Sequence, residues 1–249
     1  MITIAGYGFV GSAHEAVLKE KFEVNIYDPY KGHTYFGIPD GVIICVATPQ
    51  SADGKCFVDN VLDVIKITDV KTPILIKSTI SIEGWQSIKQ KFPNHIIAFS
   101  PEFLRAASAI DDLKNTRHIY IGGDGVGFWH ALFRTAFNDP NFTTSIAVPE
   151  ELILAKYFRN SFLATKVAFF NQIYDLCSAA GINYDVVRHI VAADSRIGHS
   201  HTEVTEQRGF GGHCFPKDTS AIVHTAGLYD VKLSLITEAI EYNHNIRKE

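Results

Sequence analysis

The chain has 249 residues, of which 46% are hydrophobic and 20% charged, and its formal net charge is −4. This length can bury the core of one large domain or of two smaller ones. The acidic balance argues against a general nucleic-acid or membrane-surface binder, because such proteins carry basic patches. No apolar run approaches the roughly 20 residues that cross a bilayer, and the start lacks the basic segment of a signal peptide. The four cysteines have no CxxC spacing, so we expect neither a metal site nor a disulfide framework, and a cytoplasmic setting.

The first half of the chain alternates between predicted strands and predicted helices. Short apolar runs typical of buried strands lie at 1–6, 23–28, 41–49, 73–79, 95–101 and 118–123. Helical spacing of apolar residues is found at 10–22, 58–68 and 82–92. Strands that alternate with helices of this length form a parallel sheet covered by helices. We therefore predict an α/β, Rossmann-like domain over residues 1–148.

A GxGxxG motif lies between the first predicted strand and the first predicted helix. Gly6 permits the tight turn, Gly8 lets the main chain approach a pyrophosphate, and Gly11 lets helix and strand pack closely. The helix then begins around Phe9 and Val10, whose main-chain N–H groups can bind the anion. This position favours dinucleotide binding over the alternative that the glycines only make turns.

Asp28 ends the second predicted strand, where a carboxylate would bind the ribose hydroxyls of a dinucleotide. An aspartate there favours NAD over NADP, because it would repel a 2′-phosphate. Lys31 would either reach the phosphates or ribose, or be an ordinary solvated lysine. Only twelve residues, 29–40, precede the next predicted strand. They are too few for a helix and a strand, so we expect a shortened dinucleotide domain.

The second half of the chain has the apolar period of helices. Residues 150–181 contain no proline and no interior glycine, and a glycine ends the run. Residues 184–194 and 234–249 predict two further helices. We therefore predict an all-α domain over residues 149–249. The long helix is apolar on more than one face, which predicts burial on several sides and a homodimer formed through it.

Lys156 and Asn160 are polar residues of this long helix. They lie four positions apart and so project from the same face. A lysine in a mostly apolar segment either extends its ammonium group to solvent or serves a site. The two residues alone leave both possibilities open.

The segment GFGGHCFPKD, residues 209–218, places Cys214 among glycines and next to Lys217. A thiol is nucleophilic as the thiolate, which neighbouring lysines favour. Glycines such as Gly211 would let a substrate approach the main chain. In a nicotinamide enzyme such a cysteine implies oxidation beyond the aldehyde, because the thiol captures the aldehyde and a second hydride transfer leaves a thioester that water cleaves. The alternative is that Cys214 only fills a tight loop.

Seven segments together resemble the UDP-glucose/GDP-mannose dehydrogenase family, and its UDP-glucose branch most closely. They are GYGFVG at 6–11, CVATP at 45–49, KST at 77–79, PEFLRAASAIDDL at 101–113, AKYFRNSFLATKVAFFNQI at 155–173, DSRIG at 194–198 and GFGGHCFPKD at 209–218. They occur in the order typical of the family and span nearly the whole chain. The resemblance implies NAD as the cofactor, a UDP-sugar as the substrate and a place in polysaccharide biosynthesis.

The resemblance also implies catalytic roles for single residues. Cys214 matches the nucleophile, Lys156 the lysine that stabilises the developing oxyanion, and Asn160 its substrate-binding neighbour. Asp218 matches the carboxylate that handles a proton through a water molecule, and Thr79 matches the threonine that holds this water.

Further roles are implied for residues outside this group. Glu102 matches the glutamate assigned to thioester hydrolysis, and it also contacts the substrate. Arg196 matches an arginine that crosses a dimer interface to the neighbouring subunit's substrate. Further substrate contacts are implied for Phe103, Leu104 and Gly211. Further cofactor contacts are implied for Val46, Thr48, Thr79 and Lys217.

Three features depart from the family pattern. A second glutamate, four residues after the first, is replaced by Ala106. The first domain is shorter than usual after its second strand. The family normally continues into a third domain with much of the nucleotide-sugar site, whereas this chain ends in the helix that leads there; an excised fragment and a naturally short protein both fit. The histidine before the cysteine, His213, resembles the pattern of relatives that act on UDP-N-acetylmannosamine. The segments DSRIG and CFPKD instead favour the UDP-glucose branch.

Three functions are compatible with the sequence. The first is an NAD-dependent dehydrogenase that oxidises the C6 alcohol of UDP-glucose, or a close UDP-sugar, to the acid in two hydride transfers. The second is a non-catalytic remnant that binds NAD or a sugar nucleotide, which Ala106 and the missing third domain support. The third is a two-electron hydroxyacid dehydrogenase, against which the cysteine segment argues, because one hydride transfer needs no thiol.

Overall fold

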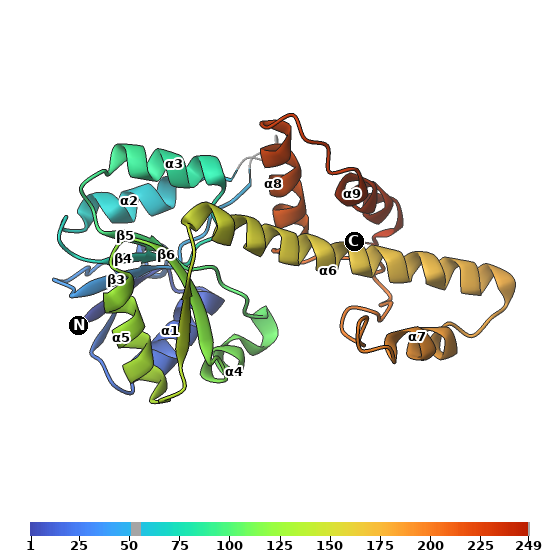
Figure 1. The fold of residues 1–249 in the computed structure, drawn as a ribbon, viewed down its shortest axis with the longest axis horizontal. Coiled ribbons are helices and arrows are strands. Elements are labelled where there is room, and N and C mark those ends of the chain that lie inside the picture. The colour runs from blue at the N-terminus through green and yellow to red at the C-terminus, as the bar shows by residue number, and fades with distance from the viewer. Residues whose placement is uncertain (51–55, 249) are drawn as a thin grey trace. The chain divides into compact units, whose positions relative to one another are not determined.

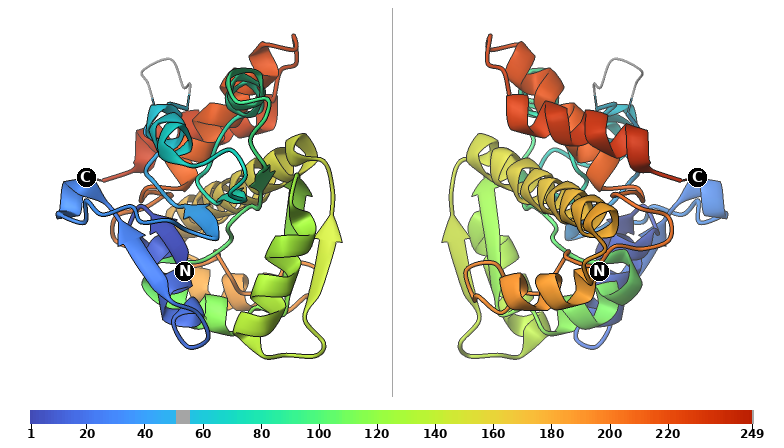
Figure 2. Two further views of the ribbon diagram at one scale, coloured as in Figure 1. Left: turned by 90° about the vertical axis from the view of Figure 1, so that its left-hand side faces the viewer. Right: turned by 90° about the vertical axis from the view of Figure 1, so that its right-hand side faces the viewer.

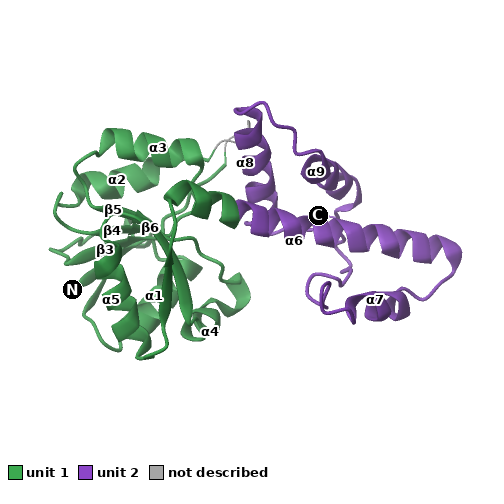
Figure 3. Ribbon diagram, in the orientation of Figure 1, with its two compact units in different colours: residues 1–51, 56–156 green, residues 52–55, 157–249 purple. Residues whose placement is uncertain are grey.

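A computed structural model describes residues 1–50 and 56–248 (Figure 1). The described chain forms two compact units, drawn in two colours in Figure 3: unit 1 contains residues 1–50 and 56–156, and unit 2 contains residues 157–248. The division falls inside the long helix α6 (Pro149–Ala180), whereas the sequence predicted a boundary at its start, after residue 148.

Unit 1 is built on a seven-stranded sheet with the strand order β2-β1-β3-β4-β5-β6-β7. The strands are β1 (Ile2–Ala5), β2 (Val24–Tyr27), β3 (Gly41–Ile44), β4 (Ile74–Ile76), β5 (Ile97–Phe99), β6 (His118–Gly123) and β7 (Thr143–Ile146). The first five strands are parallel. The predicted α/β fold with a parallel sheet is confirmed for these strands.

The prediction of a parallel strand at 118–123 is wrong, because β6 runs antiparallel to β5. The connection between them contains only the short turn η2 (Ala106–Ser108) and helix α4 (Ala109–Lys114). Helix α4 has six residues, whereas α2 (Asp59–Ile67) and α3 (Ile82–Lys91), which return the chain for parallel pairing, have nine and ten. Since α4 packs against α1 (Phe9–Leu18), the chain re-enters the sheet from the edge where β5 ends.

The central strands are buried on both faces, which explains their unbroken apolar runs. On one face, side chains of β1 and β3 pack in a single cluster with α1, α4 and α5 (Val126–Phe137), around the fully buried Trp129 and Phe133. Figure 1 shows α2 and α3 on the opposite face. This two-sided burial fixes the sheet whose carboxyl-terminal edge carries the residues discussed below.

The segment between β2 and β3 is as short as the sequence predicted. It contains the turn η1 (Pro29–Lys31) and no further strand or longer helix. The chain therefore passes from β2 to the other side of β1, where β3 pairs with β1 directly. In doubly wound sheets such a reversal of strand order opens a crevice that binds ligands at the carboxyl ends of the strands.

The described part of unit 2 is helical. It contains most of α6, followed by α7 (Tyr184–Ala192), α8 (Phe215–Gly227) and α9 (Ser234–Ile246). The helices predicted at 150–181, 184–194 and 234–249 are present, and Figure 2 shows α8 and α9 packed side by side. Within the described residues, no helix has the combination of length and apolar character that a membrane span requires.

Helix α8 was not predicted, because the glycines before Cys214 made residues 209–218 look like a continuous loop. The structure instead makes Cys214 the N-cap residue of α8 and places Pro216 in its first turn. Proline favours the first turn of a helix, where its missing N–H group costs no hydrogen bond. Lys217 and Asp218 therefore project from a helix and not from a loop.

Candidate active site

The three glycines of the motif have different surroundings. Gly6 has a φ of +92°, and a Cβ atom there would lie 2.6 Å from the main-chain nitrogen of Val46. A Cβ atom on Gly11 would lie 2.0 Å from the main-chain oxygen of Gly6. A Cβ atom on Gly8 would meet no described atom within 4 Å. Packing therefore requires the first and third glycines, whereas the second leaves open space.

This open space lies at the N-terminus of α1, whose first residues are Phe9 and Val10. The first N–H groups of a helix have no partner within the helix and favour an anion. A dinucleotide pyrophosphate fits these groups and the space beside Gly8.

Asp28 and Lys31 both hold the turn of the glycine motif. Asp28 Oδ2 accepts a hydrogen bond of 2.8 Å from the Tyr7 main-chain N–H, and Lys31 Nζ donates a hydrogen bond of 2.6 Å to the Tyr7 main-chain oxygen. Lys31 thus takes a role that neither sequence-based interpretation included. Asp28 is half-buried at the carboxyl end of β2, the position predicted for ribose recognition.

The predicted cofactor contacts after β3 and β4 are bonded to each other. Ser78 Oγ donates a hydrogen bond of 2.8 Å to the Val46 oxygen, and Thr48 Oγ1 donates one of 2.7 Å to the Thr79 oxygen. Because Val46 also touches Gly6, these three strand ends form one edge of unit 1.

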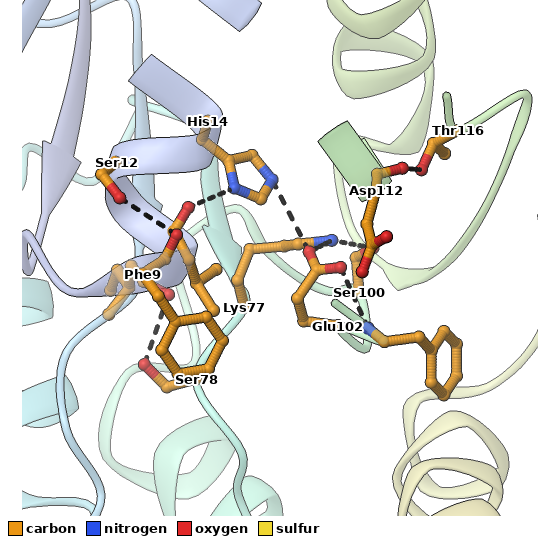
Figure 4. Close-up of polar contacts among 12 residues, drawn as sticks. Phe9, Ser12, His14, Lys77, Ser78, Ser100, Glu102, Asp112 and Thr116 are labelled. Carbon is orange, nitrogen blue, oxygen red and sulfur yellow. Dashed lines mark hydrogen bonds and ion pairs between the residues drawn. The ribbon is translucent and has the colours of Figure 1, made fainter. Parts of the chain in front are cut away.

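A buried cluster surrounds Glu102, which follows β5 (Figure 4). Its Oε2 atom lies 3.0 Å from Lys77 Nζ and 3.8 Å from His14 Nε2. Its Oε1 atom accepts a hydrogen bond of 2.9 Å from the Phe103 N–H, and Lys77 Nζ donates one of 3.0 Å to Ser100 Oγ. The Lys77 and His14 side chains are 4% and 1% exposed. The carboxylate of Glu102 is therefore held inside unit 1.

Burial and charge set the ionisation of this cluster. Burial by itself raises the pKa of Glu102, but the charge and hydrogen bond of Lys77, the charge that His14 gains when it is protonated and the hydrogen bond from the Phe103 N–H outweigh it and lower the pKa below its ordinary value. Burial, together with the charge of Lys77, lowers the pKa of His14 from 6.5 to about 4. At neutral pH the cluster thus contains a carboxylate, an ammonium group and a neutral imidazole.

The sequence motifs did not point to His14 and Lys77 as residues of the site. Lys77 lies in the KST segment, but the family resemblance assigned a role only to Thr79. Its signal was an ionisable residue directly after the wholly apolar strand β4. His14 is a polar residue on the buried face of α1.

Lys156 lies in the first part of α6, within unit 1, and is buried. Its Nζ donates a hydrogen bond to the main-chain oxygen of Glu102 and lies 5.6 Å from the centre of the Phe103 ring. The structure thus brings Lys156, Glu102 and Phe103 together. Leu104 instead packs against the apolar core of unit 1.

Four predicted residues meet in unit 2. Asn160 Nδ2 donates a hydrogen bond of 2.6 Å to Asp218 Oδ2, and Lys217 Nζ donates one of 2.7 Å to Asp218 Oδ1. The Asp218 N–H donates to the Cys214 main-chain oxygen at 2.8 Å. Asp218 is 1% exposed, and these two side chains hold its carboxylate at the first turn of α8.

Gly209 and Gly211 make room for protein groups of α9 and the segment after it. A Cβ atom on Gly209 would lie 2.2 Å from Asn243 Oδ1, and one on Gly211 would lie 2.4 Å from an Arg247 Nη atom. Only Gly212 of the three faces open space among the described atoms. The close approach of Arg247 by itself explains why residue 211 is a glycine. The sequence had instead predicted that this glycine leaves room for a substrate.

The loop before Cys214 is anchored by polar contacts to α6 and α9. Arg208 Nε donates to Asn171 Oδ1 at 2.9 Å, and Arg208 also pairs with Asp175 at 2.5 Å. Buried Asn243 bonds both the N–H and the carbonyl group of Phe210. These contacts fix the approach of the chain to α8.

Arg196 is not part of the Cys214 group. Its side chain is 87% exposed and pairs with Asp194 at 2.5 Å. Lys166 on α6 holds this loop by donating hydrogen bonds to the main-chain oxygens of Ile197 and Gly198.

Comparisons with known proteins give the family. Residues 36–127 match the NAD binding domain and residues 151–245 the central domain of the UDP-glucose/GDP-mannose dehydrogenase family. The chain belongs to this family. The resemblance found in the motifs, and NAD as the cofactor of the matched domain, are thereby confirmed.

Curated relatives include two bacterial UDP-glucose 6-dehydrogenases. YwqF of Bacillus subtilis is 34% identical over 220 residues, which cover 83% of this chain and 49% of that protein. The Campylobacter jejuni protein is 34% identical over 215 residues, which cover 82% of this chain and 53% of that protein. The chain thus spans about half the length of these relatives.

Solved structures share the fold. A UDP-glucose dehydrogenase of Pyrobaculum islandicum superimposes with a TM-score of 0.81 at 23% identity, covering 98% of this chain and 68% of that one. A 3-hydroxyisobutyrate dehydrogenase of Mycobacterium tuberculosis gives a TM-score of 0.74 at 16% identity, covering 98% and 92%. At these identities the likeness establishes the architecture alone.

The buried imidazole of His14 makes stability depend on pH. Between pH 6.5 and pH 4 the unfolded chain binds a proton at His14 that the folded protein does not bind, so acidification lowers the free energy of unfolding. The difference between 6.5 and about 4 corresponds to on the order of 3 kcal/mol. His14→Gln should flatten this dependence in urea unfolding measured across that pH range. His33→Gln, at an exposed histidine of the same unit, is the control. An unchanged slope in His14→Gln would contradict the buried neutral imidazole.

Proposed function

We propose that the chain oxidises the C6 alcohol of UDP-glucose, or of a closely related UDP-sugar, to the uronic acid with NAD. The observation that carries the proposal is the group of Cys214, Lys217, Asp218 and Asn160 in unit 2. A helix N-terminus stabilises negative charge, and Cys214 is the N-cap residue of α8, a favourable place for a thiolate. The names of the curated relatives point to the same substrate class.

The proposed reaction has three stages. The C6 hydroxyl first loses a proton and C6 loses a hydride, which gives an aldehyde. The Cys214 thiolate then adds to the aldehyde carbon, and loss of a second hydride from C6 gives a thioester. Water finally displaces the thiolate and yields the acid. NAD supplies the hydride acceptor, two equivalents for each sugar.

Other residues of the chain have supporting roles in this proposal. The ammonium group of Lys156 stabilises negative charge on the C6 oxygen in both oxidations. Asp218, held by Asn160, handles a proton of the reaction. Glu102 serves the hydrolysis of the thioester, for which its lowered pKa keeps it ionised.

The motif of unit 1 supports NAD as the cofactor. We assign the pyrophosphate to the open space at Gly8, Phe9 and Val10, and the ribose to Asp28 with Lys31. The segments with Val46, Thr48 and Thr79 lie beside the same turn, and we assign them to the cofactor. Phe103 is assigned to the substrate, whereas Leu104 packs against the core of unit 1 and the space beside Gly211 holds Arg247.

The exposed apolar face of α6 supports a homodimer. Four large side chains lie on this face at helical spacing, with exposures between 43% and 70%: Phe158, Phe162, Phe169 and Leu176. A contiguous apolar face of this kind marks a protein interface. In such a dimer the exposed Arg196 would act on the neighbouring subunit's substrate.

A serine in place of Cys214 tests the covalent route. Cys214→Ser should still allow the first hydride transfer, but an ester is cleaved far more slowly than a thioester, so turnover should fall by several orders of magnitude. Mass spectrometry should detect a covalent sugar adduct. Lys156→Ala should slow both oxidations, because loss of one such donor costs about 3 to 4 kcal/mol. Wild-type turnover of Cys214→Ser without an adduct would show that the cysteine is structural.

Cofactor choice can be measured by calorimetry. The carboxylate of Asp28 would repel a 2′-phosphate, so NAD should bind more tightly than NADP. Gly8→Ala should weaken NAD binding, because the added methyl group enters the open space proposed for the pyrophosphate. Thermal stability should not fall, because this methyl group meets no described protein atom within 4 Å. Equal or tighter binding of NADP would refute the role of Asp28.

The oligomeric state can be tested by sedimentation. We expect a dimer at micromolar concentration, and Phe162→Glu should dissociate it because a charge enters the apolar face. Ser178→Glu, at an exposed position on the opposite side of α6, should leave the dimer intact. A monomeric wild-type protein at micromolar concentration would contradict the proposed interface.

A further inference from the structure

Lys77 is a buried cation to which neither the motifs nor the proposed reaction assigns a role. It directly follows β4, and its Nζ contacts Glu102 Oε2 and Ser100 Oγ, each at 3.0 Å. A buried ammonium group lowers stability unless it is paired and hydrogen-bonded. The side chain of Lys77 is 4% exposed and contacts Glu102, a residue of the proposed active site. A function for this buried charge would explain its presence.

Other ionisable groups near Glu102 do not replace Lys77 as its partner. His14 Nδ1 lies 2.9 Å from the carbonyl oxygen of Val10, so the proton of the neutral ring is on Nδ1. Nε2 then faces the carboxylate with a lone pair, at 3.8 Å. Burial raises the pKa of the nearby Cys45 thiol, which stays neutral. The charge of the Glu102 carboxylate is thus balanced by Lys77.

Glu102 is in turn anchored at three points. Oε2 contacts Lys77, Oε1 accepts from the Phe103 N–H, and the main-chain oxygen accepts from Lys156 Nζ. The first two contacts fix the residue at the carboxyl end of β5 (Figure 4). The third uses this fixed main chain to hold the ammonium group of Lys156. A continuous line of contacts therefore runs from Lys77 through Glu102 to Lys156.

We propose that Lys77 is a positioning residue: it fixes Glu102 and, through the main-chain oxygen of Glu102, the ammonium group of Lys156. The proposal rests on the function proposed above, in which Lys156 stabilises charge on the reacting oxygen. Lys77 itself lies inside unit 1 and acts only through these neighbours.

The first experiment does not depend on activity. Lys77→Met keeps an unbranched side chain, one atom shorter, and removes its charge. Released from its fixed carbonyl partner, Lys156 should be acetylated several-fold faster by acetic anhydride, as measured by mass spectrometry of the folded protein. Lys89→Met removes another lysine of unit 1, paired with Asp124 at the surface, and should leave Lys156 labelling unchanged. Equal labelling of Lys156 in Lys77→Met and wild type would overturn the proposal.

The second experiment uses a single turnover with NAD and UDP-glucose. Lys77→Met should slow the first hydride transfer about tenfold to hundredfold, because a small displacement of Lys156 removes its charge from the reacting oxygen. NAD affinity should stay close to that of wild type, which separates loss of positioning from loss of cofactor binding. A wild-type rate in Lys77→Met would overturn the proposal. A wild-type protein that forms no NADH would refute the proposed function instead, and the labelling experiment would still decide the role of Lys77.

Folding of the variant can itself be informative. Removing one partner of a buried pair leaves an uncompensated charge, whereas removing both does not. If Lys77→Met fails to fold, the double variant Lys77→Met/Glu102→Gln should fold, which supports the pairing. A double variant that is no more stable than Lys77→Met would contradict it.

Discussion

Parallel pairing of β1, β3, β4 and β5 is the constraint on which the candidate site of unit 1 depends. It places the carboxyl ends of four strands at one edge of the sheet. The segments that follow these strands carry Gly6, Val46, Thr79 and Glu102. These residues are far apart in sequence, and the strand register brings them to one edge. The short segment after β2 preserves this arrangement, because β3 pairs directly with β1.

Each unit also contains a charged pair that holds a residue of the proposed active site. Glu102 of one pair contacts Lys156, and Asp218 of the other contacts Asn160. In unit 1 the pair is Lys77 and Glu102, and in unit 2 it is Lys217 and Asp218. Buried pairs are weak sources of stability, because desolvation offsets their attraction. Their benefit in a catalyst is a fixed position. This argues that the pairs serve the chemistry of the site more than the stability of the fold.

The sequence predicted those features that neighbouring residues encode. The glycine motif, the five parallel strands and the long α6 all follow from local spacing and apolar period. The reversal at β6 depends on where α4 packs, which no local pattern shows. Likewise, the absence of a side chain at Gly211 was visible, but the atom that occupies its space, from Arg247, was not. The role of Lys77 was missed because its partner Glu102 follows a different strand.

The most direct test of the proposed function is the number of NADH molecules formed for each molecule of sugar consumed, with UDP-glucose and related UDP-sugars as limiting substrates. We expect two, because in the proposed reaction the aldehyde captured by Cys214 is oxidised a second time before water releases the acid. A yield of one would indicate a two-electron dehydrogenase and would contradict the role of Cys214. No NADH from any of these sugars would contradict catalysis itself and would indicate a protein that only binds NAD or a sugar nucleotide.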